Sequence, residues 1–160
     1  MTKQINSKLL FFILIIVSLV LVSAYIIEYE LGHKPCKLCL YERIPYFVSI
    51  ILILKIFYTK SYNRITLLVL SLIFIISSIL AFYHFGIEQG FFNESFSCTA
   101  ENLSSTLSKE QLLEKLEQSS ISCKNVSFRL LGLSLAAVNN ILSIFLSVIF
   151  MKLFLNYGKN

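Results

Sequence analysis

The strongest pattern in the chain is a series of long apolar stretches separated by short charged segments. Residues 9–27 and 65–85 contain no Asp, Glu, Lys or Arg, and a further apolar stretch covers residues 130–155. The hydrocarbon core of a bilayer requires about 20 mostly apolar residues in a helix, so each stretch is long enough to cross it. Residues 44–58 form a shorter stretch with Pro45 and Lys55. Because Lys55 lies near its end, the ammonium group can reach the headgroups, and we expect four transmembrane helices.

These spans predict an all-α membrane protein, a four-helix transmembrane bundle that forms a single domain over residues 1–160. Backbone groups in lipid must be hydrogen-bonded within the protein, which excludes an open sheet. The composition agrees, since 56% of the residues are hydrophobic and 14% are charged, against about 25% charged in soluble domains. The net charge of +5 is not gathered into a basic run, so we expect no nucleic-acid binding.

The first span has a second interpretation as a signal peptide. Lys3 and Lys8 precede it, and Val22-Ser23-Ala24 resembles a small-residue cleavage site. The apolar run continues beyond that site to Ile27, which favours a retained helix.

Four helices place both termini on one side of the membrane and the loops 28–43 and 86–129 on the other. Lys and Arg divide evenly between the two sides, but Lys109 and Lys115 lie in the middle of the long loop, where they weigh less in the positive-inside rule. All four cysteines, Cys36, Cys39, Cys98 and Cys123, fall in the two loops that share a side. An oxidising exterior suits that arrangement, so we expect the termini in the cytoplasm and the loops outside.

The first cysteine pair has the spacing of a redox centre. Cys36 and Cys39 form a C-x-x-C motif just before the second span, and a helix that begins there favours a thiolate, the form that attacks disulfides. Two other interpretations remain, a zinc site and a structural disulfide, and each is disfavoured by the spacing of the cysteines. Cys98 and Cys123 are too far apart to form the second half of an ordinary zinc knuckle. A structural disulfide across C-x-x-C would close only a very small loop and stabilise little.

Two polar side chains border the same region. Arg43 lies one helical turn beyond Cys39, where it can bind an anion or a polar carbonyl, or simply anchor the helix at the headgroups. His84 ends the third span and is either an interfacial residue or a hydrogen-bond donor to a cofactor. Asn139 and Asn140 are interpreted as contacts between helices.

The long loop contains one helical signal. Ser108 and Gln111 have capping-box spacing, and Leu112, Leu113 and Leu116 then share a face. We expect a short amphipathic helix on the membrane surface, with a solvated loop as the alternative.

The segment Cys36-Lys37-Leu38-Cys39-Leu40-Tyr41-Glu42-Arg43 closely resembles the signature of the DsbB family of bacterial inner-membrane proteins. The resemblance extends to the four spans, the second cysteine pair, residues 83–88, and residues 129–136 at the last helix. Phe128 stands where many members have Trp, and Lys124-Asn125 replaces a commonly acidic pair. These departures concern partner docking more than chemistry.

The resemblance implies a disulfide-generating enzyme, a quinone-dependent thiol oxidoreductase. It would reoxidise a periplasmic thioredoxin-like dithiol oxidase (DsbA-like) and pass two electrons to a membrane quinone, ubiquinone or menaquinone. In these terms Cys98 forms the mixed disulfide with the partner, Cys123 then attacks Cys36, and Cys39 is the thiolate that faces the quinone. Arg43 polarises the quinone and His84 lines its site. No metal is expected.

Two alternatives stay open. One is a related oxidoreductase that serves a single dedicated partner. The other is a non-catalytic membrane protein with structural disulfides or bound zinc. The direction of electron flow does not follow from the sequence, because thiol–disulfide exchange is reversible.

Overall fold

The structure is a computed structural model that describes residues 7–33, 35–59, 63–93, 123, 129–130 and 132–157. Four long helices make up most of these residues. They are α1 (Ser7–Tyr29), α2 (Lys37–Tyr58), α3 (Asn63–Glu88) and α5 (Leu135–Asn156). The short strands β1 (Arg129–Leu130) and β2 (Leu133–Ser134) pair antiparallel around Gly132, whose φ of 86° suits glycine.

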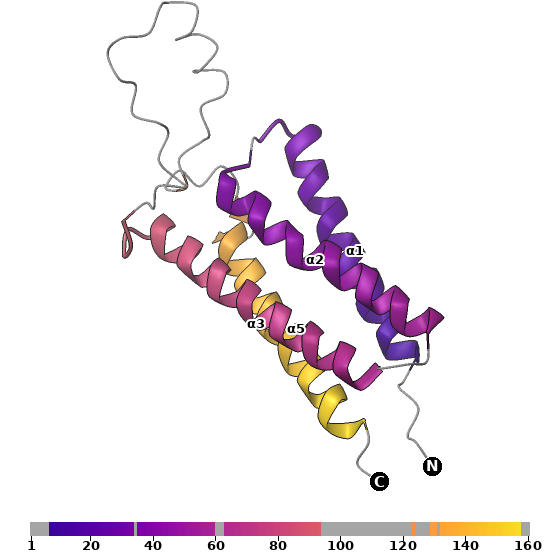
Figure 1. Cartoon of the computed structure of the whole chain (residues 1–160). Coiled ribbons are helices and arrows are strands. Elements are labelled where there is room, and N and C mark those ends of the chain that lie inside the picture. Colours follow the sequence, from indigo (N-terminus) through magenta and orange to yellow (C-terminus); the bar gives the residue numbers. More distant parts are fainter. Residues whose placement is uncertain are drawn as a thin grey trace, which may run out of the picture.

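The helices alternate in direction along the bundle. α1 packs against α2, α2 against α3, and α3 along α5. The start of α1 and the end of α5 therefore lie at the same end of the bundle (Figure 1). The starts of α2 and α5 and the end of α3 lie at the opposite end. The expected all-α membrane bundle is confirmed, while the amphipathic helix expected near residue 108 lies outside the described residues.

Three of the helices, α1, α3 and α5, are long and apolar enough to cross a membrane. α2 has similar length but carries Lys37, Glu42, Arg43 and Lys55. It begins seven residues before the expected span at residue 44, because the hydrophobic pattern starts only after the charged first turns. The helix start that the sequence favours at the C-x-x-C motif is confirmed, so Cys39, Glu42 and Arg43, which the span bounds left in the loop 28–43, lie on a helix whose geometry fixes their relative positions.

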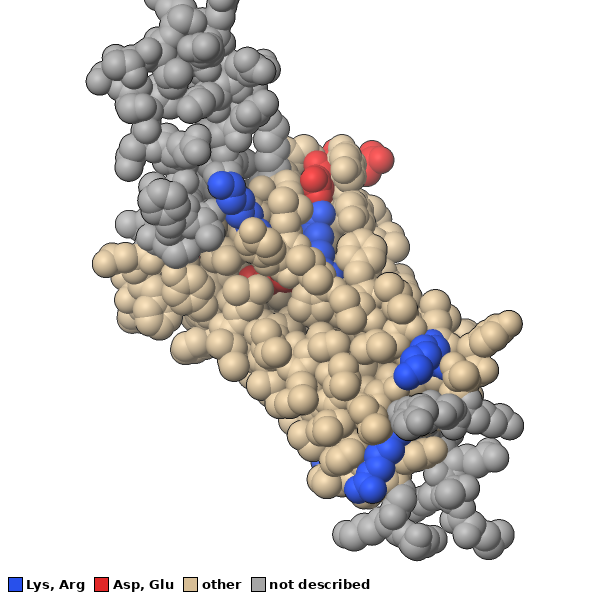
Figure 2. Space-filling model, in the orientation of Figure 1, with Lys and Arg blue, Asp and Glu red and all other residues tan. Residues whose placement is uncertain are grey.

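The outer surface of the bundle suits lipid. Large apolar side chains such as Phe11, Leu19, Ile51, Ile76 and Phe145 are exposed. Figure 2 shows one face with a wide uncharged band between charged side chains near the two ends. A soluble protein rarely exposes so continuous an apolar surface, and the band matches a hydrocarbon layer.

Small polar residues allow α3 and α5 to approach closely. The Ser71 hydroxyl donates to the Ser147 carbonyl at 3.2 Å, and the Ser147 hydroxyl donates back to the Ser71 carbonyl at 3.4 Å. The hydroxyls of Ser77 and Ser143 lie 3.1 Å apart, and both residues are fully buried. Small residues of this kind permit tight packing of helices in membranes. α3 and α5 thus form the most tightly joined pair of the bundle.

This interface predicts a strong dependence on side-chain size at position 77. Ser77→Ala removes one hydrogen bond between the helices and should lower the free energy of unfolding by about 0.6 kcal/mol. Ser77→Leu must force the helices apart and should cost about 1–3 kcal/mol. Equilibrium unfolding in mixed detergent micelles measures both, and equal stability of the two variants would contradict this account of the interface.

Candidate functional site

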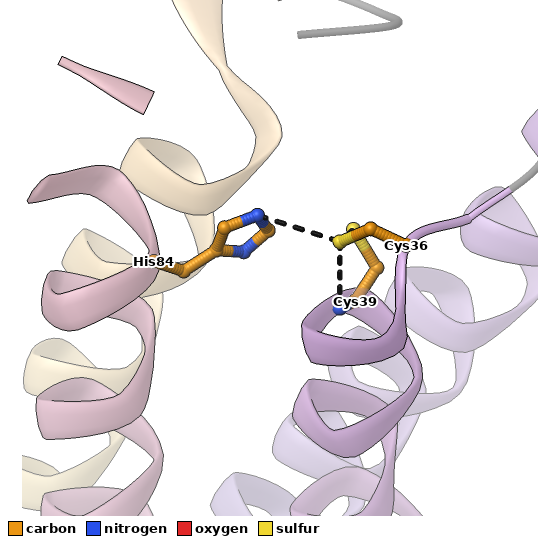
Figure 3. Close-up of side chains that lie close together, drawn as sticks. All are labelled: Cys36, Cys39 and His84. Carbon is orange, nitrogen blue, oxygen red and sulfur yellow. Dashed lines mark hydrogen bonds between the residues drawn. The ribbon is translucent and has the colours of Figure 1, made fainter. Parts of the chain in front are cut away.

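The C-x-x-C pair forms the beginning of α2. Cys36 is the N-cap, with extended backbone angles, and its Sγ accepts a hydrogen bond from the Cys39 backbone N–H at 3.3 Å. The two sulfur atoms lie 2.9 Å apart (Figure 3), and both residues are free cysteines. A sulfur at an N-cap takes the place of the usual Ser or Asp oxygen, and the positive end of the helix dipole favours its thiolate.

α3 brings His84 to the same point. Its Nε2 lies 3.5 Å from the Cys36 Sγ, and its side chain points from α3 toward the cysteine pair (Figure 3). Cys123 also reaches Cys36, to which its thiol is hydrogen-bonded. Both cysteines are buried in one cluster with Leu38 and Ile87. Three of the four expected cysteines therefore meet with His84, while Cys98 lies outside the described residues.

These contacts act on the acidity of Cys36. The hydrogen bonds from Cys123 and Cys39 lower the pKa of the Cys36 thiol far below its usual range, burial opposes them, and His84 adds to the lowering. In the reduced protein these contacts therefore favour the thiolate form of Cys36. This direction agrees with the thiolate that the helix terminus favours within the C-x-x-C pair, which stays a prediction.

Glu42 links the site to two further helices. The residue is buried, and its Oε1 accepts a hydrogen bond from His84 Nδ1 at 2.7 Å. Its Oε2 accepts from Asn139 Nδ2 on α5, also at 2.7 Å. The Tyr46 hydroxyl in turn donates to Asn139 Oδ1. Both carboxylate oxygens are thus paired inside the bundle.

Arg43 joins α2 to α1. Its Nη1 donates to the Glu28 carboxylate, its Nη2 donates to the Ala24 carbonyl at 3.5 Å, and the guanidinium carbon lies 5.0 Å from the centre of the Tyr25 ring. The ion pair is only slightly exposed, with 13% of the Arg43 side chain and 20% of the Glu28 side chain accessible. Such a guanidinium is held in place and partly neutralised before any ligand arrives.

A cavity of about 560 Å³ connects these groups. Its volume falls within the usual range for sites that bind small organic molecules, about 300–1,000 Å³. Its polar lining includes Cys36, Cys39, Glu42, Arg43, His84 and Glu88. Its apolar lining comes mainly from α1 and α5 and includes Val20, Leu21, Ile27, Leu135, Val138 and Leu142. The cavity therefore suits a ligand with a polar ring and an apolar body.

Several of these residues were not singled out from the sequence. Glu42 was noted only within the C-x-x-C segment, although its place one turn after Cys39 puts it on the same helix face. Asn139 was assigned to contacts between helices, which it does make, but it also lines the cavity. Asn140 makes the expected contact between helices, since it accepts a hydrogen bond from Ser78 on α3 at 2.9 Å. Tyr46, Glu28 and Glu88 gave no signal of their own in the sequence.

Comparison with known proteins identifies the family. Residues 6–153 match the model of a protein family described as "Disulfide bond formation protein DsbB". The chain belongs to the DsbB family. It is also 33% identical over 161 residues to a protein of Rickettsia prowazekii (strain Madrid E) named "Uncharacterized protein RP370", with 99% of this chain and 93% of the relative covered. DsbB-family membership makes this chain a membrane thiol oxidoreductase of disulfide-bond formation.

The low pKa of Cys36 predicts an unusual pH profile for its alkylation in the reduced DsbB-family protein. An ordinary thiol, with a pKa of about 8.5, loses more than about tenfold in thiolate between about pH 8 and pH 6. We expect Cys36 to stay ionised across this range, and its rate of reaction with iodoacetamide to change by less than about threefold. Mass spectrometry of the Cys36 peptide measures the rate, with a small model thiol as reference. A decline parallel to that of the model thiol would contradict the prediction.

Proposed function

We propose that this protein oxidises a periplasmic thioredoxin-like dithiol oxidase of the DsbA type and passes the two electrons to a membrane quinone, ubiquinone or menaquinone. The observation that carries the proposal is the cavity, in which both sulfurs of the C-x-x-C pair share one space with Arg43 and His84. A DsbA-type oxidase is much more oxidising than an ordinary dithiol. Its reoxidation therefore requires a stronger terminal oxidant, and a quinone dissolved in the bilayer supplies one.

The cysteines divide the work between two exchanges. Cys98 forms the mixed disulfide with the partner, and Cys123, once released, attacks Cys36 of the Cys36–Cys39 disulfide, which breaks that bond and releases Cys39 as a thiolate. The hydrogen bond between the thiols of Cys123 and Cys36 supports this second step, since exchange requires the sulfurs to approach. Cys39 is the sulfur that faces the quinone. Its place on the cavity wall supports that role.

Arg43 and His84 serve the quinone end of the cavity. The guanidinium of Arg43 polarises a quinone oxygen and stabilises the negative charge that develops there. His84 lines the same space. A quinone has two ring carbonyls and an apolar body, and this matches a cavity with charged groups beside walls from α1 and α5.

The proposed location is the bacterial inner membrane, with both termini in the cytoplasm and the cysteine loops in the periplasm. The ends of α1 and α5 that carry the termini lie opposite the C-x-x-C end of the bundle (Figure 1), which is consistent with this orientation. The oxidising periplasm then contains the thiol chemistry.

The central experiment is anaerobic mixing of the purified, reduced protein with a soluble quinone, with thiols counted and quinone followed optically. We expect one quinone to be consumed for each disulfide formed, and Cys39→Ser to abolish the reaction. Thiols that persist in the presence of quinone would overturn the proposal. Trapping the mixed disulfide on a Cys123→Ser variant then distinguishes a general oxidase from one dedicated partner.

A second candidate, a zinc-binding membrane protein, rests on one observation. The ligand atoms of Cys36, Cys39 and His84 all lie within 4.8 Å of one another, and Cys and His are the usual zinc ligands. Metal analysis of protein purified without chelator tests it. About one zinc per chain, with thiols that do not react with quinone, would favour this candidate over the oxidase.

Arg43→Lys should weaken quinone use while leaving the fold intact. Lysine keeps the charge but cannot bind Glu28, the Ala24 carbonyl and a ligand through one planar group. We expect the KM for quinone to rise by about tenfold, the equivalent of about 1.4 kcal/mol. The matched control is Arg64→Lys, because Arg64 stacks on Phe154, 5.1 Å from its ring centre, and does not line the cavity. An unchanged KM in Arg43→Lys would refute the assigned role.

A further inference from the structure

Cys36, His84 and Glu42 form an unbroken chain of contacts through the site. The Cys36 Sγ lies 3.5 Å from His84 Nε2, and His84 Nδ1 lies 2.7 Å from Glu42 Oε1. The His84 side chain is 4% exposed and that of Glu42 is 9% exposed, so water does not compete for these contacts. A thiol, an imidazole and a carboxylate in this order are the arrangement that activates a cysteine nucleophile.

The order of the contacts defines which ring nitrogen carries a proton. A carboxylate oxygen only accepts hydrogen bonds, so His84 Nδ1 must be the donor to Glu42. In neutral His84 the other nitrogen, Nε2, then has a lone pair directed at Cys36. Nε2 is therefore placed to receive the proton of the Cys36 thiol.

We propose that Glu42 is a positioning residue that holds His84 in the orientation and tautomer in which Nε2 accepts the thiol proton of Cys36. This inference rests on the proposed function and adds the proton path to it. When the S–S bond between Cys36 and Cys39 forms, two thiols lose two electrons and two protons, and a quinone takes up both pairs to become a quinol. His84 holds one of those protons, the one that leaves Cys36.

The surroundings of Glu42 fit a positioning role. Asn139 holds the second carboxylate oxygen at 2.7 Å, and Tyr46 orients the Asn139 amide from the other side. With Oε2 held by Asn139, the carboxylate directs its other oxygen, Oε1, at His84 Nδ1. Arg43, the next residue, pairs with Glu28 and does not take Glu42 away from His84.

Glu88 is a second carboxyl group close enough to His84 to affect its protonation by charge alone. Its Oε1 lies 3.7 Å from His84 Nε2, and its side chain is 6% exposed. It approaches the nitrogen that faces Cys36, beyond the distance of a good hydrogen bond. Ser134 is hydrogen-bonded to it. Glu88 thus places a second buried carboxyl group near the ring but does not contact Nδ1, which makes it a matched control.

The test compares three variants of the full-length reduced protein without quinone. Glu42→Gln removes the charge at Nδ1 with little change of shape. The double variant Glu42→Gln with Asn139→Asp keeps one buried carboxylate and the hydrogen bond between positions 42 and 139, but moves the charge away from His84. Glu88→Gln removes the other nearby charge. The readouts are the ultraviolet absorbance of the thiolate and the alkylation rate of Cys36 at neutral pH, with thermal unfolding as the check on folding.

We expect Glu42→Gln and the double variant to raise the pKa of the Cys36 thiol above neutral, so that at pH 7 they lose most of the thiolate absorbance and react about tenfold more slowly with iodoacetamide. Glu88→Gln should keep the absorbance. Retention of the thiolate in a folded Glu42→Gln or double variant would overturn the proposal. An equal loss in Glu88→Gln would do the same, because it would indicate charge alone rather than orientation.

Turnover distinguishes this inference from the function on which it rests. If the wild-type protein oxidises its thiols with quinone, both Glu42 variants should lower kcat about tenfold, with the KM for quinone unchanged. A wild-type protein that shows the Glu42-dependent thiolate but no reaction with quinone would refute the proposed function and leave the proton path intact. A changed KM with an unchanged kcat would place Glu42 in quinone binding instead and refute its positioning role.

Discussion

The pairing of the Glu42 carboxylate inside the bundle is the contact on which the rest of the site depends. Removing an ionised carboxylate from water costs several kcal/mol unless its oxygens find good partners. Glu42 on α2 finds them in His84 on α3 and Asn139 on α5. Three helices must therefore meet at one depth, and the orientation of His84 toward Cys36 follows from that requirement.

The tight contact between α3 and α5 makes this meeting reproducible. The reciprocal hydrogen bonds between Ser71 and Ser147 and the contact between Ser77 and Ser143 hold these helices in register. His84 and Asn139 extend from this joined pair, so the packing of α3 against α5 sets their separation. α2 then contributes both the carboxylate and the cysteine pair, which puts the acid–base groups and the sulfurs on one rigid frame.

Much of this arrangement could be predicted from the sequence, and the limits have a physical cause. Hydropathy indicated the helices because burial in lipid acts on every residue of a span, and the C-x-x-C segment indicated the chemistry because its spacing is local. The bond between Glu42 and Asn139 joins residues 97 positions apart, and no local pattern encodes it. Hydropathy placed the second span only from residue 44 because the first turns of α2 carry charge, whereas the C-x-x-C motif indicated the earlier helix start that Cys36 caps. The pairing of Arg43 with Glu28 likewise depends on the packing of α1 against α2.

The composition of the cavity wall has a consequence for kinetics. Its apolar lining comes mainly from α1 and α5, helices whose other faces expose Leu19 and Phe145. Under the proposed function, the oxidant arrives by lateral diffusion within the bilayer, whereas the dithiol protein arrives from the aqueous phase. The two reactants occupy separate pools and meet different faces of the bundle. A high concentration of one reactant therefore does not keep the other from its site. The rate of disulfide formation is limited by whichever reactant is depleted first.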